Sequence, residues 1–126
     1  MSFDIVVLRL SPDAGLVPDL SEVGDVLSLG SLLDVRAALD ATFPAIDWSS
    51  NHFALYRATE GFALEFSVPN KSEPTSLHVT LHFGADLKAW DAAGSPAFDS
   101  LFRRLYEHYQ WQSFAASDNS SLLLEG

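Results

Sequence analysis

Two histidines and a threonine alternate along one apolar segment in the second half of the chain. His78, Thr80 and His82 are separated by valine and leucine, so an extended strand would direct all three side chains to one face. Imidazole transfers protons near neutral pH, and a hydroxyl about 7 Å away on the same strand could hold a substrate oxygen. The pattern therefore makes His78 and Thr80 a candidate catalytic pair.

The same spacing argues against a metal site. On a strand, His78 and His82 would lie roughly 13 Å apart, which is too far for both to bind one ion. Glu65, on a neighbouring predicted strand, could join one of them, but two ligands do not complete a site. The chain has no cysteine, which excludes thiolate metal sites, disulfides and a cysteine nucleophile. We therefore expect no metal and no cofactor.

The segment His78-Val79-Thr80-Leu81-His82-Phe83 resembles the His-x-Thr-Leu-x-Phe motif of the 2H phosphoesterases. This resemblance implies that His78 acts as acid or base while the Thr80 hydroxyl holds a phosphate oxygen. The family carries two such motifs, whereas the other histidines here stand in His52-Phe53-Ala54 and His108-Tyr109-Gln110. A Gly-x-Ser-x-Gly elbow and glycine-rich phosphate loops are also missing from the sequence. An enzyme that uses His78 and Thr80 is thus the alternative to a non-enzymatic protein.

Acidic residues dominate the charge of the chain. Seventeen Asp and Glu residues stand against seven Lys and Arg, which gives a net charge of −10 at pH 7. The basic residues are scattered, so we expect binding neither to nucleic acid nor to an anionic membrane. The segment from Asp13 to Asp47 holds seven acidic residues and one base, Arg36. Two interpretations stay open for this segment: a solvated surface, or a docking face for a basic protein.

The docking interpretation selects a small set of candidate binding residues. Tryptophan often anchors protein interfaces, and Trp48 follows directly on the acidic segment. The candidates are Asp34, Asp40, Asp47 and Trp48.

The spacing of apolar residues predicts a single α+β domain over residues 1–126, with the order β-α-β-β-β-α-β. Ser31 with Asp34 predicts a capping box at the start of the first helix, and Pro44 ends that helix. Ser95-Pro96 begins the second helix, with Ser95 as its cap. Short connections between strands favour an antiparallel or mixed sheet of about five strands, with both helices on one face. The expected strands are 3–10, 53–58, 62–68, 77–83 and 111–115, with a short closing strand at 122–124 and an irregular segment at 86–94.

Alternating strands would leave the other face of the sheet wetter than the face under the helices. A small-molecule site around Tyr56, Glu65 and His82 is therefore a further interpretation. The side chains expected on this open face are Tyr56, Glu65, Ser67, His78, Thr80 and His82.

Over most of its length the chain resembles a group of small bacterial α+β proteins of uncharacterised function. The resemblance is carried by Leu29-Gly30-Ser31, Phe43-Pro44-Ala45-Ile46-Asp47-Trp48-Ser49, Gly61-Phe62-Ala63-Leu64-Glu65-Phe66 and Gln110-Trp111. The size, acidity and element order of the chain are also similar to those of immunity proteins of polymorphic toxin systems. This resemblance implies a protein that binds and blocks a basic toxin. Short apolar runs and an N-terminus without signal-peptide features favour the cytoplasm.

Overall fold

A computed structural model of the chain describes residues 2–11, 13, 15–83, 92 and 94–122. Its helices are α1 (Leu32–Thr42) and α3 (Ser95–Tyr109), with a short 3-10 helix, η2 (Leu20–Glu22). Its strands are β1 (Ser2–Leu10), β2 (Val26–Leu27), β3 (Asp47–Trp48), β4 (Phe53–Arg57), β5 (Phe62–Ser67), β6 (Ser76–Phe83) and β7 (Trp111–Ala115).

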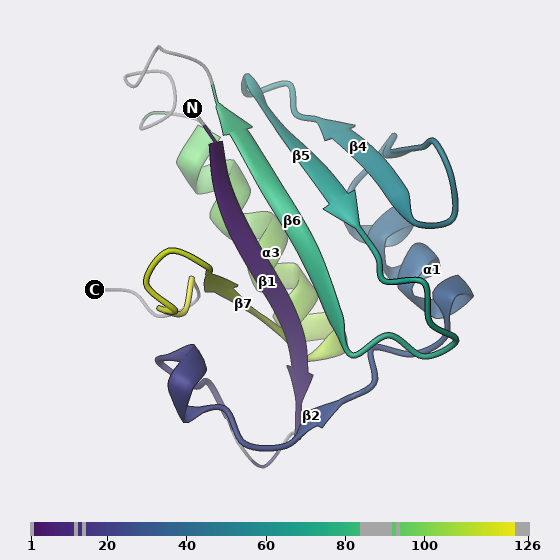
Figure 1. Cartoon of the computed structure of the whole chain (residues 1–126). Helices are drawn as coiled ribbons and strands as arrows, with labels where there is room; N and C mark the ends of the chain where they lie inside the picture. Colours follow the sequence, from purple (N-terminus) through teal and green to yellow (C-terminus); the bar gives the residue numbers. More distant parts are fainter. Residues whose placement is uncertain (1, 12, 14, 84–91, 93, 123–126) are drawn as a thin grey trace.

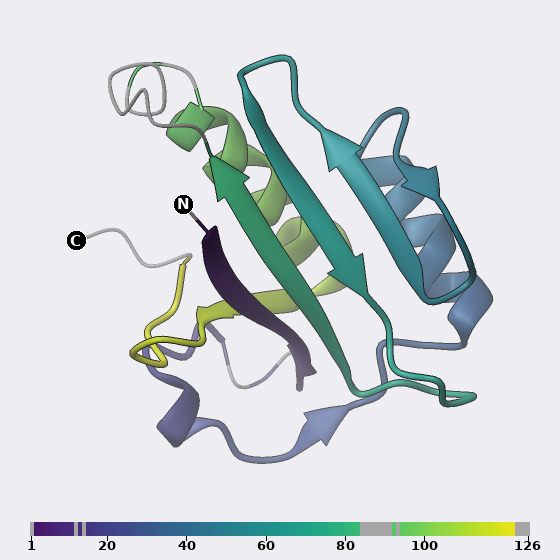
Figure 2. The same ribbon diagram turned by 45° about the horizontal axis from the view of Figure 1, so that its top comes forward.

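The strands form one antiparallel sheet, and α1 and α3 cover the same face of it (Figure 1, Figure 2). Six of the strands follow the order β2-β1-β6-β5-β4-β3, and β7 pairs with β1. The predicted α+β class is confirmed. The sheet of the described chain has seven strands rather than about five, because the two-residue strands β2 and β3 are too short to show an alternating pattern in the sequence.

Strand β1 lies inside the sheet and pairs with β6, β7 and β2. Its apolar residues on both faces suit this position, because an interior strand covered on both sides has no wet face. Ile5 and Val7 point toward the helices and are fully buried. Leu8 and Leu10 point the other way and are also buried.

Those outward residues are buried because the chain after β1 folds back over this end of the sheet. The amide of Val17 donates to Oε1 of Gln112 at 2.9 Å, and Nε2 of Gln112 donates to the Gly15 carbonyl at 2.6 Å. The turn after β7 closes the cover, since the Leu20 amide donates to the Asn119 carbonyl at 2.7 Å. The open face is therefore restricted to β6, β5, β4 and the first half of β1.

Phe43 is the centre of the core between the helices and the sheet. Its ring is fully buried and meets the rings of Tyr56, Phe66 and Phe102 edge-on, at centroid distances of 5.3, 4.9 and 6.0 Å. Edge-to-face pairs stabilise a core beyond the area that they bury. The residue that ends α1 thus joins both helices to the sheet.

The helix starts follow local chemistry. Both hydrogen bonds of the predicted Ser31–Asp34 capping box are present, so that prediction is confirmed. The prediction that Ser95 caps the second helix is wrong by one position: α3 begins at Ser95, and Gly94 is its N-cap. Most of the predicted irregular segment 86–94, and residues 123 and 124 of the predicted closing strand, lie outside the described residues.

Phe43 and Phe53 offer a matched pair for testing the core. Phe43→Leu should lower the free energy of unfolding by about 2 kcal/mol, because it leaves a gap and removes three ring contacts. Phe53→Leu should change it by less than about 0.5 kcal/mol, because that ring is 57% exposed. Urea unfolding of both variants measures the difference, and equal losses would contradict this packing.

Two turns near the fold-back each contain an aspartate whose carboxyl pKa is lowered, Asp19 in one and Asp118 in the other. Hydrogen bonds from the Ser21 hydroxyl and amide lower the pKa of Asp19, and bonds from the Ser120 hydroxyl and amide lower the pKa of Asp118. Folding therefore favours the ionised carboxylates. Their contribution to stability is present above the ordinary carboxyl pKa of about 3.9 and is lost as the pH falls through the lowered values.

Ser120→Ala should raise the pKa of Asp118 toward its ordinary value, because two hydrogen-bond donors become one. An NMR titration of the side-chain carboxyl signals measures this shift, and Asp19 serves as the internal control. An Asp118 pKa that does not move in the variant would show that the Ser120 hydroxyl is not its cause.

Candidate functional site

The strand register gathers polar side chains on the sheet face opposite the helices. Asp4 pairs with Thr80, and Thr80 pairs with Glu65 on its other side. Side chains two residues apart on a strand share a face, so His78 and His82 flank Thr80 there. Ser67, which pairs with His78, lies on the same face. Five of the six predicted open-face residues are thus together.

Two carboxylate–imidazole pairs lie within this group. Oδ1 of Asp4 accepts a hydrogen bond from the Thr80 hydroxyl at 3.1 Å and lies 3.5 Å from Nε2 of His78. Oε1 of Glu65 lies 3.1 Å from Nε2 of His82. All four ionisable side chains are between 44% and 62% exposed, so water screens both pairs.

This arrangement is unfavourable for the phosphoesterase chemistry of His78 and Thr80. The hydroxyl that would hold a phosphate oxygen already donates to the Asp4 carboxylate. A phosphate at this position would meet the negative charges of Asp4 and Glu65. The side chains also lie on an open surface, whereas phosphoryl chemistry relies on groups held in a site that excludes water.

Tyr56 is not on the open face, and its predicted placement there is wrong. It pairs with Leu64, a buried residue under the helices, and its ring packs against Phe43 and Phe62. Burial raises the pKa of the Tyr56 phenol; Glu60 adds to the rise and Arg104 opposes it. Tyr56, Glu65 and His82 therefore do not form one site, because the sheet separates the first from the other two.

The acidic segment is divided between the two layers of the fold. Asp34 is part of the capping box of α1, on the helix side of the sheet. Asp47 and Trp48 are neighbours on β3, and their side chains point to opposite faces. Asp47 pairs with Leu55 and faces the open side, so the four predicted docking residues do not form one surface.

Trp48 is held against α1 rather than presented to solvent. Its indole nitrogen donates to Oδ1 of Asp40 at 2.7 Å, and the Arg36 guanidinium lies 5.1 Å from its ring centre. The structure brings Asp40 and Trp48 together, but as partners of each other. Arg36 and Asp40, which lie one helical turn apart on α1, both contact this ring.

A different apolar group is exposed on the open face. Phe53 is 57% exposed and lines a hollow of about 310 Å³ at the β3–β4–β5 end of the sheet. Leu55, on the same face of β4, also lines this Phe53 hollow, and Asp47 and Glu65 are its acidic groups. The full lining is Asp47, Ser49, Phe53, Ala54, Leu55, Glu65 and Phe66.

Sequence reasoning missed Phe53 and Leu55 because β4 is apolar on both faces. Phe53, Leu55 and Arg57 alternate with Ala54 and Tyr56, and this alternation does not show which set faces the helices. Pairing with β5 decides it, since Ala54 and Tyr56 lie opposite the buried Phe66 and Leu64. Phe53 and Leu55 are therefore left on the open face of the sheet.

Among the described residues, no group of three His, Asp or Glu side chains could hold a metal ion. No helix in the described part of the chain is long and apolar enough to cross a membrane. Comparisons with family models, curated proteins and solved structures found no match to this chain. The Phe53 hollow and the row of Asp4, Thr80 and Glu65 beside it are the candidate functional site.

Because the histidine pairs are exposed, they should contribute little to folding. His78→Ala should change the free energy of unfolding by less than about 0.5 kcal/mol. Val79→Ala, on the same strand but fully buried, should lower it by about 2 kcal/mol. Denaturant unfolding compares the two, and a large loss in His78→Ala would mean that the imidazole is part of the core.

Proposed function

We propose that this protein is a non-enzymatic binding module that docks a basic protein on its open sheet face, in the manner of a toxin-neutralising immunity protein. The single observation that carries this proposal is the exposed Phe53 ring beside the carboxylates of Asp47 and Glu65. An exposed aromatic residue in a shaped, apolar hollow is typical of an interface anchor.

The charge around the hollow selects the partner. Asp47 and Glu65 line it, and Asp4 lies two strands beyond Glu65, in the same cross-strand row. With a net charge of −10, the protein attracts cationic partners and speeds their approach. The fitting surface presents an apolar side chain between lysines or arginines. A second copy of this chain would instead place carboxylates against carboxylates, which is repulsive.

The two alternatives receive less support from the structure. The Thr80 hydroxyl is bound to Asp4, which opposes phosphate binding by His78 and Thr80. A small-molecule site on the open face cannot include Tyr56, because that residue lies on the helix side of the sheet. Docking of a protein needs neither an enclosed cavity nor a free Thr80 hydroxyl, only the exposed surface that is present.

The test captures partners with the immobilised protein from a lysate of the source cells, followed by titration calorimetry with the purified basic partner. Phe53→Ala should weaken that partner's affinity at least about tenfold, since interface anchors commonly have effects of this size or larger. Leu33→Ala is the matched control, because Leu33 is an apolar side chain that is 77% exposed on α1, away from the open face.

A charge test complements the apolar one. The double variant Asp47→Lys and Glu65→Lys should abolish binding at low salt, whereas Asp25→Lys, in the loop before β2, should retain it. Binding by the native protein should weaken as salt rises. A partner that binds Phe53→Ala and the double variant with native affinity would place the docking surface elsewhere and contradict the proposal.

A further inference from the structure

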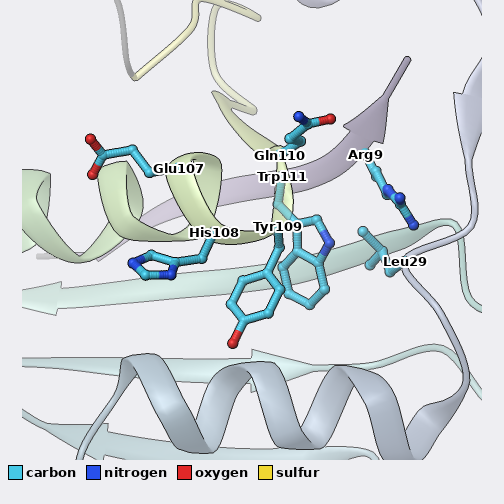
Figure 3. A pocket seen from close by; sticks show the side chains of 7 residues that line it. All are labelled: Arg9, Leu29, Glu107, His108, Tyr109, Gln110 and Trp111. Atoms are coloured by element: carbon cyan, nitrogen blue, oxygen red, sulfur yellow. The ribbon is translucent and has the colours of Figure 1, made fainter. Parts of the chain in front are cut away.

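A second hollow lies on the helix side of the sheet, where β1 ends and α3 gives way to β7. Its volume is about 460 Å³, within the range of small-ligand sites. Figure 3 shows the residues that line it: Arg9, Leu29, Glu107, His108, Tyr109, Gln110 and Trp111. We call it the Arg9 hollow. It is separate from the Phe53 hollow, which lies on the opposite face of the sheet.

Arg9 is a cation with unused hydrogen-bond donors. It follows Ile5 and Val7 on the inward side of β1, so its side chain enters from the sheet. Its one hydrogen bond to the described residues is long, 3.4 Å from Nη1 to the Ser28 carbonyl. Its Nε is buried and has no hydrogen-bond partner among the residues that the structure describes. In the described part of the chain no carboxylate lies within ion-pair distance of Arg9.

Trp111 adds a second hydrogen-bond donor to the same hollow. The residue is only 2% exposed, and its ring lies 5.5 Å from that of Tyr109, centre to centre. Its indole N–H makes no hydrogen bond to any described residue. Figure 3 shows the indole nitrogen on the side of the ring toward Arg9 and Leu29. Of the two donors, Arg9 Nε is the buried one without an acceptor. Such groups are rare, and a bound group or water usually satisfies them.

The remaining charges of the hollow lie at its far end. Glu107 and His108 are exposed on the last turn of α3, and Figure 3 shows both beyond the Tyr109 ring from Arg9. The carbonyls at the end of α3 carry about half a negative charge, which is smaller than the full charge of the guanidinium. The end near Arg9 is therefore cationic, in a protein whose net charge is −10.

We infer that the Arg9 hollow binds a small ligand with a carboxylate or phosphate group on a flat apolar body. The oxyanion accepts hydrogen bonds from the Arg9 guanidinium, which binds such groups through two parallel N–H donors. The flat body lies against the Tyr109 and Trp111 rings, where stacking and the indole N–H fix its position. The site is independent of the docking of a protein on the open face.

Four probes separate the parts of this ligand in titrations of the native protein. Benzoate and phenyl phosphate carry an oxyanion and a ring, acetate carries the oxyanion alone, and benzamide carries the ring alone. Calorimetry gives the affinities, and NMR follows the three indole N–H signals. We expect saturable binding of benzoate or phenyl phosphate with a shift of the Trp111 signal, and at least about tenfold weaker binding of acetate and benzamide. The stronger of the first two identifies the oxyanion.

Variants then assign the donors. Arg9→Gln should weaken the preferred probe at least about tenfold, Arg9→Lys should weaken it less, and Arg57→Gln, an exposed arginine on β4, should leave it unchanged. Trp111→Phe keeps an aromatic ring, although a smaller one, removes the indole N–H, and should weaken binding of the preferred probe. Phe53→Ala should bind the probe normally, so failure here and failure of the docking proposal are distinguishable. The inference would be overturned if no probe showed saturable binding, or if folded Arg9→Gln bound the preferred probe as tightly as the native protein. In either case water would be the partner of these donors.

Discussion

The position of β1 inside the sheet is the constraint on which the rest of the structure depends. Its eight-residue apolar core segment, Phe3 to Leu10, has almost no polar face, so both sides must be covered. The helices cover Ile5 and Val7, and the fold-back of residues 15–23 covers Leu8 and Leu10. Because the fold-back reaches only this end, the sheet beyond it stays open at β6, β5 and β4, where the Phe53 hollow forms.

Local chemistry in the sequence was sufficient to place the two helices, apart from the cap of α3, and two strands. Ser31 and Asp34 sit three residues apart and cap α1 as expected, since a capping box needs no distant partner. The strict alternation of β5 and β6 also determined their faces, because one set of side chains is apolar and the other polar. Glu65, His78, Thr80 and His82 were therefore placed correctly.

Long-range pairing decided what local chemistry could not. Both faces of β4 are apolar, so the burial of Tyr56 and the exposure of Phe53 follow from the register with β5 alone. The density of acidic residues between Asp13 and Asp47 likewise says nothing about faces, and the structure spreads them over a loop, a helix and an edge strand. The sequence gives no sign of a role for Arg9, because the unpaired state of its Nε depends on the residues that surround it in the fold.

The alternation of β1 also separates the charges of the open face from those of the Arg9 hollow. Asp4 points to the open face and accepts from Thr80, whereas Arg9, an odd number of residues later, points to the helix side. One strand thus supplies an anionic group to one face and a cationic group to the other. The open face carries the carboxylates of Asp4, Asp47 and Glu65, whereas the Arg9 hollow, on the other side of the sheet, carries the guanidinium. The same strand geometry that demands two covered faces therefore allows two surfaces of opposite charge to coexist in a chain of 126 residues.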